Sequence, residues 1–501
     1  MVVVWLCILL SSVVIANHRP HIVMIVMDDL GSHDLGMHGT GIFTPTIDDL
    51  AQAGIYLDNY YVTPYCSSTR AALLSGLYPQ HTGVHSVILE RSTAGLPLNV
   101  TTIADILGSE ANYQTHAVGK WHCGHSRWEQ TPTFRGFQSF FGFYQGSQDY
   151  LSHKSNGGYD FRFDSKPRCG NGCSQTVDER GNYSTHVFTR EAIQVIEDFA
   201  NYNNGTQPLF LYLAYQAVHC PDEVPDEYKS RYSNKINWTD QRKTYAGMLT
   251  AADEGIGNVT DALRRTGLWE DTLLVFTTDN GGPTITGCVQ GSSNFPKRGG
   301  KHSLWEGGTK GDAFVGGPAL EYILGHTVGM NRRFPHLFHV VDWLPTLAEV
   351  VGTIPKRNKN IDISLDGKSQ LASFRDFERP APRQELFVGY CLTGQWFGPA
   401  VRYQNWKIIQ GSSAGPDQYD RNPQGSRQQQ PGGLANATYL LFDLETDPLE
   451  LNDISDKYPL VLQEMVFKLR QYQETFVPQQ PNNDPSCPFT GPVNTTVGPT
   501  W

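Results

Sequence analysis

Acidic and amide side chains follow two apolar runs of the chain, in positions where their oxygen atoms could share one ligand. One run ends at Asp28 and Asp29, and a second continues through two threonines to Asp279 and Asn280. Three carboxylates and an amide, without an adjacent His or Cys, suit Ca²⁺ or Mg²⁺ better than Zn²⁺. Each pair alone also fits a capped turn, but their equivalent places after two predicted strands favour one hard-cation site.

A candidate nucleophile, Cys66, stands before Ser67-Ser68-Thr69-Arg70 and a helix-favouring run that ends at Gly76. The three hydroxyl residues can cap a helix that Gly76 closes. At such a helix N-terminus the dipole and Arg70 favour negative charge on Cys66. The spacing alone leaves a half-disulfide or a buried thiol equally open.

Four further polar residues, Lys120, His122, His219 and Lys301, stand close to the ends of apolar runs or in a Gly-rich segment. Lysines are usually solvated on the surface, and an isolated histidine more often donates to a core carbonyl than performs catalysis. Only the surrounding motifs favour a role for them in chemistry.

The elements that must position these residues alternate along the chain. Apolar runs typical of strands buried on both faces lie at 21–27, 115–118, 209–213 and 273–276. Helical patterns lie at 46–53, 70–77, 102–107 and 189–200. The alternation predicts an α/β core whose ligands gather beyond the carboxyl ends of the strands. The run 334–351 reads as a core helix kinked at Pro345.

The pattern of predicted elements changes near Glu385. Runs at 386–390, 400–409 and 439–443 predict a smaller, antiparallel sheet, and 411–434, rich in Gly, Pro and Gln, predicts a long surface loop. We therefore expect a catalytic α/β domain over 17–384 and a smaller C-terminal α+β domain over 385–501, with an irregular tail.

These residues carry a resemblance to a known family. Cys66-x-x-x-Arg70, followed by Leu-Leu-Ser-Gly, resembles the sulfatase signature usually written C-x-P-S-R. The resemblance extends to Asp28-Asp29, 119–122, His219, Asp279-Asn280, 298–308 and, in the C-terminal domain, 442–448. Within the family, 301–308 and 245–248 are most similar to the arylsulfatase B, or N-acetylgalactosamine-4-sulfatase, group.

The resemblance implies an alkaline-phosphatase-like fold, a large mixed, mostly parallel sheet flanked by helices. It also implies that the formylglycine-generating enzyme oxidises Cys66 to formylglycine (3-oxoalanine), whose hydrate is the nucleophile. One Ca²⁺ ion would be held by the side chains at five positions. They are Asp28, Asp29, residue 66, Asp279 and Asn280.

The resemblance also assigns roles to the remaining site residues. Arg70 would orient the aldehyde hydrate, and Asp279 could take the proton of the attacking hydroxyl. Lys120, His219 and Lys301 match positions that hold the sulfate. Lys301 or His219 could protonate the leaving oxygen, and His122 matches the base that helps to release sulfate from residue 66.

The signature departs from its usual form at two positions, since Ser68 replaces Pro and Thr69 replaces Ser. Pro restricts an extended chain more than Ser does, so oxidation of Cys66 stays open. Three functions therefore compete: an active sulfatase acting on 4-sulfated N-acetylgalactosamine, a non-catalytic binder of sulfated glycans, and a phosphoester or phosphonate hydrolase of the same superfamily. The segment 148–182 is the candidate rim that sets specificity.

Composition excludes several other classes of protein. The chain has 501 residues, of which 39% are hydrophobic and 18% charged, which excludes a disordered acidic chain and a coiled coil. Its net charge of -11, with no run of five like charges, disfavours a nucleic-acid partner. An anionic substrate would therefore need locally concentrated positive charge.

The N-terminus indicates the secretory pathway, with a lysosomal or extracellular destination. Residues 1–16 are apolar, end at small Ala16, and fit a cleaved signal peptide rather than a stable membrane anchor. Cys169 and Cys173 are close enough in sequence for a local disulfide. Seven glycosylation sequons agree with this route. They are Asn99, Asn182, Asn204, Asn237, Asn258, Asn436 and Asn494.

Overall fold

The computed structural model describes residues 18–155, 158–203, 205–284, 291–354, 364–391, 398–410 and 439–478. The expected signal peptide, the expected loop 411–434 and the last part of the expected tail lie outside the described residues. No helix within these ranges combines the length and apolarity needed to cross a membrane.

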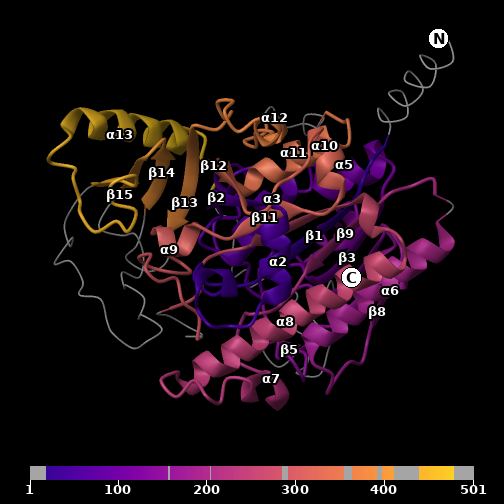
Figure 1. Cartoon of the computed structure of the whole chain (residues 1–501). Coiled ribbons are helices and arrows are strands. Elements are labelled where there is room, and N and C mark those ends of the chain that lie inside the picture. Colours follow the sequence, from indigo (N-terminus) through magenta and orange to yellow (C-terminus); the bar gives the residue numbers. More distant parts are fainter. Residues whose placement is uncertain are drawn as a thin grey trace, which may run out of the picture.

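Ten strands of the described chain form the main sheet, in the order β12-β2-β11-β10-β1-β9-β3-β4-β7-β8 (Figure 1). The central run from β10 to β4 is parallel, while β11, β7 and β8 run antiparallel to their neighbours. The mixed, mostly parallel sheet is therefore confirmed. The bounds are β1 (His21–Met27), β2 (Ile55–Tyr61), β3 (Gln114–Lys120), β4 (Ser139–Phe143), β7 (Arg162–Asp164), β8 (Ser174–Thr176), β9 (Leu209–Ala214), β10 (Thr272–Thr278), β11 (Ala313–Gly316) and β12 (Arg332–His339).

Helices cover both faces of this sheet, as the unbroken apolar strands predict. Alternate residues of β1 show why: Ile22 and Met24 belong to one apolar core, whereas Val23 and Ile25 belong to the other. The first core packs under α3 (Cys66–Ser75), α5 (Ile103–Glu110), α10 (Ala319–Leu324) and α11 (Trp343–Val350). The second packs under α2 (Pro45–Ala53), α6 (Ser184–Tyr202) and α8 (Asp240–Arg265).

The smaller antiparallel sheet is also confirmed, and it lies beside the main sheet together with helix α13 (Figure 1). Its first strand begins at Glu385. The elements are β13 (Glu385–Cys391), β14 (Gly398–Tyr403), β15 (Trp406–Gln410), β16 (Tyr439–Asp443) and α13 (Pro459–Glu474). Short elements elsewhere are α4 (Pro79–Thr82), α7 (Asp226–Ser230), α9 (Glu306–Thr309), α12 (Leu371–Arg375), β5 (Lys154–Ser155) and β6 (Gly158–Tyr159).

The expected helix over 334–351 is wrong in its first half. Residues up to His339 form β12, which pairs in parallel with β2, and α11 begins only at Trp343. Pro345 therefore stands in the first turn of α11, where a missing N–H breaks no intrahelical hydrogen bond and no kink is required.

Two expectations for a secreted chain can be compared with the structure. Cys169 and Cys173 form the expected local disulfide. The four sequon asparagines within the described ranges are exposed, whereas Asn204, Asn436 and Asn494 lie outside those ranges. The exposed four are Asn99, Asn182, Asn237 and Asn258.

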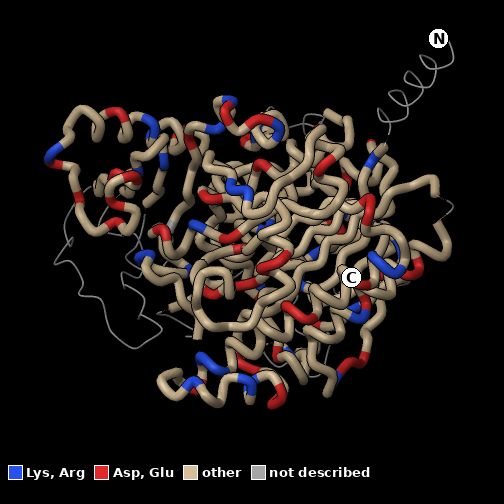
Figure 2. The backbone as a smooth tube through the Cα atoms, in the orientation of Figure 1, with Lys and Arg blue, Asp and Glu red and all other residues tan. Residues whose placement is uncertain are grey.

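Figure 2 shows basic and acidic residues interspersed along the backbone rather than separated into broad regions.

Candidate active site

Strand register brings the predicted site residues together at one edge of the main sheet. Met27, the last residue of β1, pairs with Thr278, the last of β10, so Asp28 and Asp279 begin adjacent loops. On the other side of β1, Val26 pairs with Ala214 at the end of β9. The Asp279 N–H donates to the Met27 carbonyl (3.1 Å) and the Asp28 N–H to the Ala217 carbonyl (3.0 Å), which fixes both loops.

The predicted cation ligands converge in this place. One ligand atom from each of Asp28, Cys66 and Asp279 lies within 4.8 Å of the other two. Asn280 Nδ2 donates to Asp29 Oδ1 at 2.7 Å, and Asp29 adopts a left-handed backbone with φ 59°. Such strain in a non-glycine residue is held by surrounding contacts and is common at functional sites.

Two oxygens of this cluster fit a bound cation. Asp28 Oδ1 and Asn280 Oδ1 are buried, and neither has a hydrogen-bond partner in the described chain. Buried oxygens are normally paired, because an unpaired one loses its hydration without compensation. The pKa of Asp28 is raised, first by burial and then by the neighbouring Asp279 carboxylate. A bound divalent cation would stabilise the charged carboxylate and oppose this rise.

Cys66 is the first residue of α3, as predicted, and its side chain is buried as a free thiol. Burial raises the pKa of this thiol despite Lys120 and Lys301 nearby. The expected capping hydroxyls do not cap the helix. Ser68 Oγ donates instead to the Tyr65 carbonyl (2.9 Å), and Ser67 Oγ accepts the Ile88 N–H (3.0 Å).

Three cations face the three carboxylates of the cluster. Arg70 donates through Nε and Nη2 to Asp279 Oδ2 at 3.0 and 2.9 Å. Lys120 Nζ lies 2.5 Å from Asp28 Oδ2, and Lys301 Nζ lies 2.7 and 2.8 Å from the two oxygens of Asp29. The three charges of each sign cancel, so a divalent cation would make the cluster net positive and suited to an anion.

The two predicted histidines lie at the same site in neutral form. Burial, followed by Lys301, lowers the pKa of His219 to about 3. Its Nδ1–H donates to the Cys220 carbonyl (2.7 Å), and its Nε2 lies 3.6 Å from Asp29 Oδ2. Burial also lowers the pKa of His122, whose Nε2–H donates to the Ile88 carbonyl (3.0 Å) and whose Nδ1 is left unpaired.

The chain is similar to one known protein family over most of its length. A family model described as Sulfatase matches residues 20–353. The chain belongs to the sulfatase family. Members of this family hydrolyse sulfate esters.

Individual relatives of this sulfatase cover most of its length. It is 35% identical to arylsulfatase J of Mus musculus over 93% of this chain and 78% of that protein. It is 30% identical to arylsulfatase A of Homo sapiens over 89% and 86% of the two chains. The crystal structure of Ps i-CgsB superposes with a TM-score of 0.77 at 29% identity, covering 94% of this chain and 96% of that one.

One structural neighbour bears on the phosphonate alternative. The phosphonate monoester hydrolase of Agrobacterium radiobacter superposes with a TM-score of 0.59 at 18% identity. Such a likeness shows a common fold alone.

The candidate catalytic pocket of this sulfatase, called the catalytic pocket below, has a volume of about 320 Å³ and lies at the charged cluster. Its floor includes Asp29, Cys66, His122, His219 and Lys301, so the structure brings these predicted residues to one cavity. Its walls come from 87–90, 145–147, Cys220, Pro283 and His302. None of the described residues of the expected rim, 148–182, lines this pocket.

The segment that carries Lys301 is fixed by a buried ionic cluster that the sequence did not reveal. Lys407 of the small sheet lies 2.9 Å from Glu306 and 2.7 Å from Glu450. Glu450 also accepts the Glu306 N–H (2.7 Å). These partners are far apart in sequence and no motif joins them, so only the tertiary structure shows that the second sheet supports the catalytic segment.

Proposed function

We propose that this sulfatase removes sulfate from sulfated N-acetylgalactosamine in glycosaminoglycans, using a formylglycine at position 66 and one Ca²⁺ ion. The observation that carries the proposal is the convergence of Cys66, Asp28 and Asp279 within 4.8 Å, at a pocket that Cys66, Lys301 and His219 help to line. The signal-like leader and the sequons support action in the secretory pathway, in a lysosome or outside the cell.

The cation would be held by side-chain oxygens of Asp28, Asp29, Asp279 and Asn280, together with an oxygen on residue 66. The unpaired Asp28 Oδ1 and Asn280 Oδ1 support this set, and oxygen-only ligands are what Ca²⁺ prefers. When bound, the ion supplies positive charge that polarises a sulfate ester and lowers the pKa of a nearby hydroxyl.

Position 66 provides the nucleophile in this proposal. A hydrated aldehyde there has two hydroxyls: one attacks sulfur, and the other later gives up its proton as the carbonyl re-forms and the carbon–oxygen bond to sulfate breaks. Arg70 holds Asp279 Oδ2 by two hydrogen bonds, close to residue 66. Asp279 thus stands where it can accept the proton of the attacking hydroxyl.

Lys301 is the residue best suited to protonate the leaving oxygen. The Asp29 carboxylate raises its pKa above that of a free lysine although burial opposes this, so the amine carries a proton to give. His219 is neutral, and its Nδ1–H is committed to the Cys220 carbonyl, which leaves Nε2 without a proton. Lys120, Lys301 and His219 would surround the sulfate oxygens.

His122 is suited to the release of sulfate. Its Nε2–H is held by the Ile88 carbonyl, so its unpaired Nδ1 carries the lone pair and faces a buried environment next to the pocket. This nitrogen can take the proton of the second hydroxyl on residue 66 as sulfate leaves. The aldehyde that re-forms must then add one water to regenerate the hydrate.

The sugar is supported by the relatives rather than by a contact in the pocket. The human N-acetylgalactosamine-6-sulfatase is 28% identical over 93% of this chain. The likeness of 301–308 to the arylsulfatase B group favours the 4-sulfate, which places two sulfate positions in competition.

The test is turnover by the purified, full-length glycoprotein on four substrates: 4-sulfated and 6-sulfated N-acetylgalactosamine, a small aryl sulfate and the matching aryl phosphate. We expect hydrolysis of the aryl sulfate and a higher kcat/KM on the 4-sulfated sugar than on the 6-sulfated one. Binding of the sugars without turnover of either sulfate would favour the non-catalytic binder. Faster hydrolysis of the phosphate than of the sulfate would favour the phosphoester hydrolase.

A further inference from the structure

A second polar pocket, with a volume of about 560 Å³, lies behind two loops of the catalytic site. Asp29 lines the catalytic pocket, whereas Ser32 and His33 of the same loop line the second one. Likewise Lys301 faces the catalytic pocket and Lys297 faces the second one. The same two loops therefore contribute to both pockets, although no single residue lines both.

Two lysine amines in this pocket lack a carboxylate partner. Lys310 Nζ donates only to the neutral Asn59 side chain, at 3.2 Å. Lys297 donates its backbone N–H to the Asn294 carbonyl, and its amine makes no hydrogen bond or ion pair with the described residues. Both side chains are part-buried rather than free in solvent.

Each of the two carboxylates that line the same pocket already accepts a hydrogen bond. Asp58 accepts a hydrogen bond from Arg333 Nε at 2.7 Å. Asp312 Oδ1 accepts a hydrogen bond from the Tyr56 hydroxyl and lies 3.9 Å from His38 Nε2. Asp312 Oδ2 has no hydrogen-bond partner among the described residues, and the carboxylate attracts the Lys297 amine through space.

A third carboxylate, Glu306, acts on both lysines through space but is committed elsewhere. It accepts the Tyr61 hydroxyl at 2.6 Å and pairs with Lys407 at 2.9 Å. The lining of the second pocket itself carries three cationic side chains, Lys297, Lys310 and Arg333, against two carboxylates, Asp58 and Asp312, so its net charge is positive.

Both lysine amines are partly removed from water, which disfavours their charged forms. Burial is the main cause that lowers the pKa of Lys297. Burial, opposed by Glu306 and reinforced by the charge of Lys297, lowers the pKa of Lys310 to about 8. An anion beside the two amines would favour their charged forms and oppose both shifts.

We propose that the second pocket binds a tetrahedral oxyanion between Lys297 and Lys310, and that it serves as a subsite for a second sulfate group of a polysulfated glycan. Two ammonium groups offer six N–H donors, and charge-assisted hydrogen bonds to an oxyanion are stronger than neutral ones. The choice of a glycan-borne sulfate rests on the proposed function, whereas anion binding itself does not.

The test is acetylation of the wild-type glycoprotein by acetic anhydride near pH 8, with peptide mass spectrometry at Lys297, Lys310 and the surface reference Lys229. Three additives are compared at equal ionic strength: sodium sulfate, chondroitin sulfate and sodium chloride. At sulfate about tenfold above its Kd only about a tenth of the pocket stays free, so labelling of the two pocket lysines should slow about tenfold. Labelling of Lys229, which pairs with Asp240 on the surface, should not change.

Each pattern of protection decides between sources of the anion. Protection by chondroitin sulfate, with or without protection by inorganic sulfate, supports the glycan subsite. Protection by inorganic sulfate alone supports an oxyanion site but overturns the glycan assignment. Equal protection by chloride, or no protection at either lysine, overturns the proposal.

A second measurement separates this proposal from the proposed function. Lys297→Met should raise the KM for chondroitin sulfate about tenfold, the loss of one charge-assisted contact, and leave kcat/KM for a small aryl sulfate unchanged. Lys229→Met is the matched control and should change neither. If the wild type turns over no sulfate ester, the proposed function fails while the labelling result still stands; equal KM values for Lys297→Met and wild type would overturn the subsite.

Discussion

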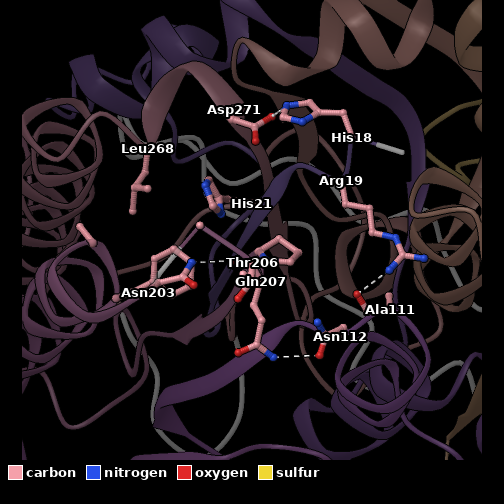
Figure 3. A pocket seen from close by; sticks show the side chains of 14 residues that line it. His18, Arg19, His21, Ala111, Asn112, Asn203, Thr206, Gln207, Leu268 and Asp271 are labelled. Carbon is pink, nitrogen blue, oxygen red and sulfur yellow. Dashed lines mark hydrogen bonds and ion pairs between the residues drawn. The ribbon is translucent and has the colours of Figure 1, made fainter. Parts of the chain in front are cut away.

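The two ends of the central strands carry pockets of similar volume that differ in how their polar groups are paired. The catalytic pocket, of about 320 Å³, lies beyond the carboxyl ends of β1, β9 and β10. Another, of about 370 Å³, lies at the amino ends of β1 and β9, where His21 begins β1 (Figure 3).

In the amino-end pocket of Figure 3, the polar groups are paired by hydrogen bonds or ion pairs. His18 Nε2 lies 2.7 Å from Asp271 Oδ1, and Arg19 donates to the Val351 and Ala111 carbonyls at 3.0 and 2.7 Å. Gln207 Nε2 donates to Asn112 Oδ1 at 2.9 Å. Nothing in this set calls for a ligand.

The catalytic pocket instead lies at a cluster of charges of both signs in which buried atoms are left unpaired. Three carboxylates crowd one cluster, and Asp28 Oδ1, Asn280 Oδ1 and His122 Nδ1 have no partner among the described residues. Because such groups cost folding free energy, their presence points to function. The comparison teaches that unsatisfied buried chemistry, rather than cavity volume, distinguishes the site.

The largest expected effect is the loss of turnover when the nucleophile is removed. Cys66→Ala should lower kcat for an aryl sulfate by at least about 10⁴-fold, because it removes the proposed nucleophile. Cys123→Ala is the matched control, since Cys123 is the other buried free thiol of the described chain and lines neither pocket. A Cys66→Ala enzyme within tenfold of wild type would remove residue 66 from the mechanism.

The next largest effect is a contrast between the two pockets, in which one substitution lowers activity and the other lowers stability. Lys301→Met should lower kcat/KM by about 10²–10³-fold without loss of folding, because it removes a proton donor and a sulfate contact. Arg19→Met should keep the activity but lower the free energy of unfolding by about 1–3 kcal/mol, since two buried carbonyls lose their donor. Denaturant unfolding and steady-state kinetics on both variants check this; an active Lys301→Met enzyme would contradict it.

The stabilising effect of Ca²⁺ should also differ between variants at the two ends of the strands. Ca²⁺ at about 100 times its Kd should add about 2.7 kcal/mol to the free energy of unfolding, and a chelator should remove it. Asp279→Asn should abolish most of this calcium-dependent gain, whereas Asp271→Asn at the amino end should retain it. Calorimetry with and without Ca²⁺ gives the answer, and an equal gain in both variants would argue against the oxygen cluster as the ion site.

The smallest effect concerns pH and the amino-end pocket. Burial, opposed by Asp271, lowers the pKa of His21, whose Nδ1 accepts the Leu209 N–H at 3.0 Å. The folded state thus binds fewer protons than the unfolded one, so this histidine's contribution to stability is present above a pH of about 6.5 and is lost as pH falls.

His21→Asn keeps an acceptor but cannot titrate. Its destabilisation relative to wild type should therefore be larger at pH 7 than at pH 5 in urea unfolding, with turnover unchanged. A gap that widens on acidification would mean that the sign of the His21 shift is wrong.

Much of the fold and the site could be predicted because both depend on local patterns. Unbroken apolar runs located β1, β3, β9 and β10, and polar residues directly after them had to meet at one sheet edge. The segment 334–351 is predicted as one helix because the apolar residues of β12 and α11 follow closely, with only the short 3₁₀ helix 340–342 between the strand and the helix.

The pocket walls could not be predicted because backbone contacts place them. Ile88 reaches the site by donating its N–H to Ser67 and accepting from His122, and neither contact leaves a pattern in the sequence. The pairing of Lys407 with Glu306 and Glu450, and the meeting of Lys297 with Lys310, likewise depend on tertiary packing between distant segments.

The most direct test of the central claim is peptide mass spectrometry across residue 66 of the glycoprotein purified from a secretory host. If the carboxyl-end pocket is a formylglycine-dependent sulfatase site, the peptide should carry an aldehyde in place of the Cys66 thiol, in proportion to the specific activity of each preparation. A folded protein that hydrolyses sulfate esters while residue 66 remains entirely a free thiol or a disulfide would contradict the account.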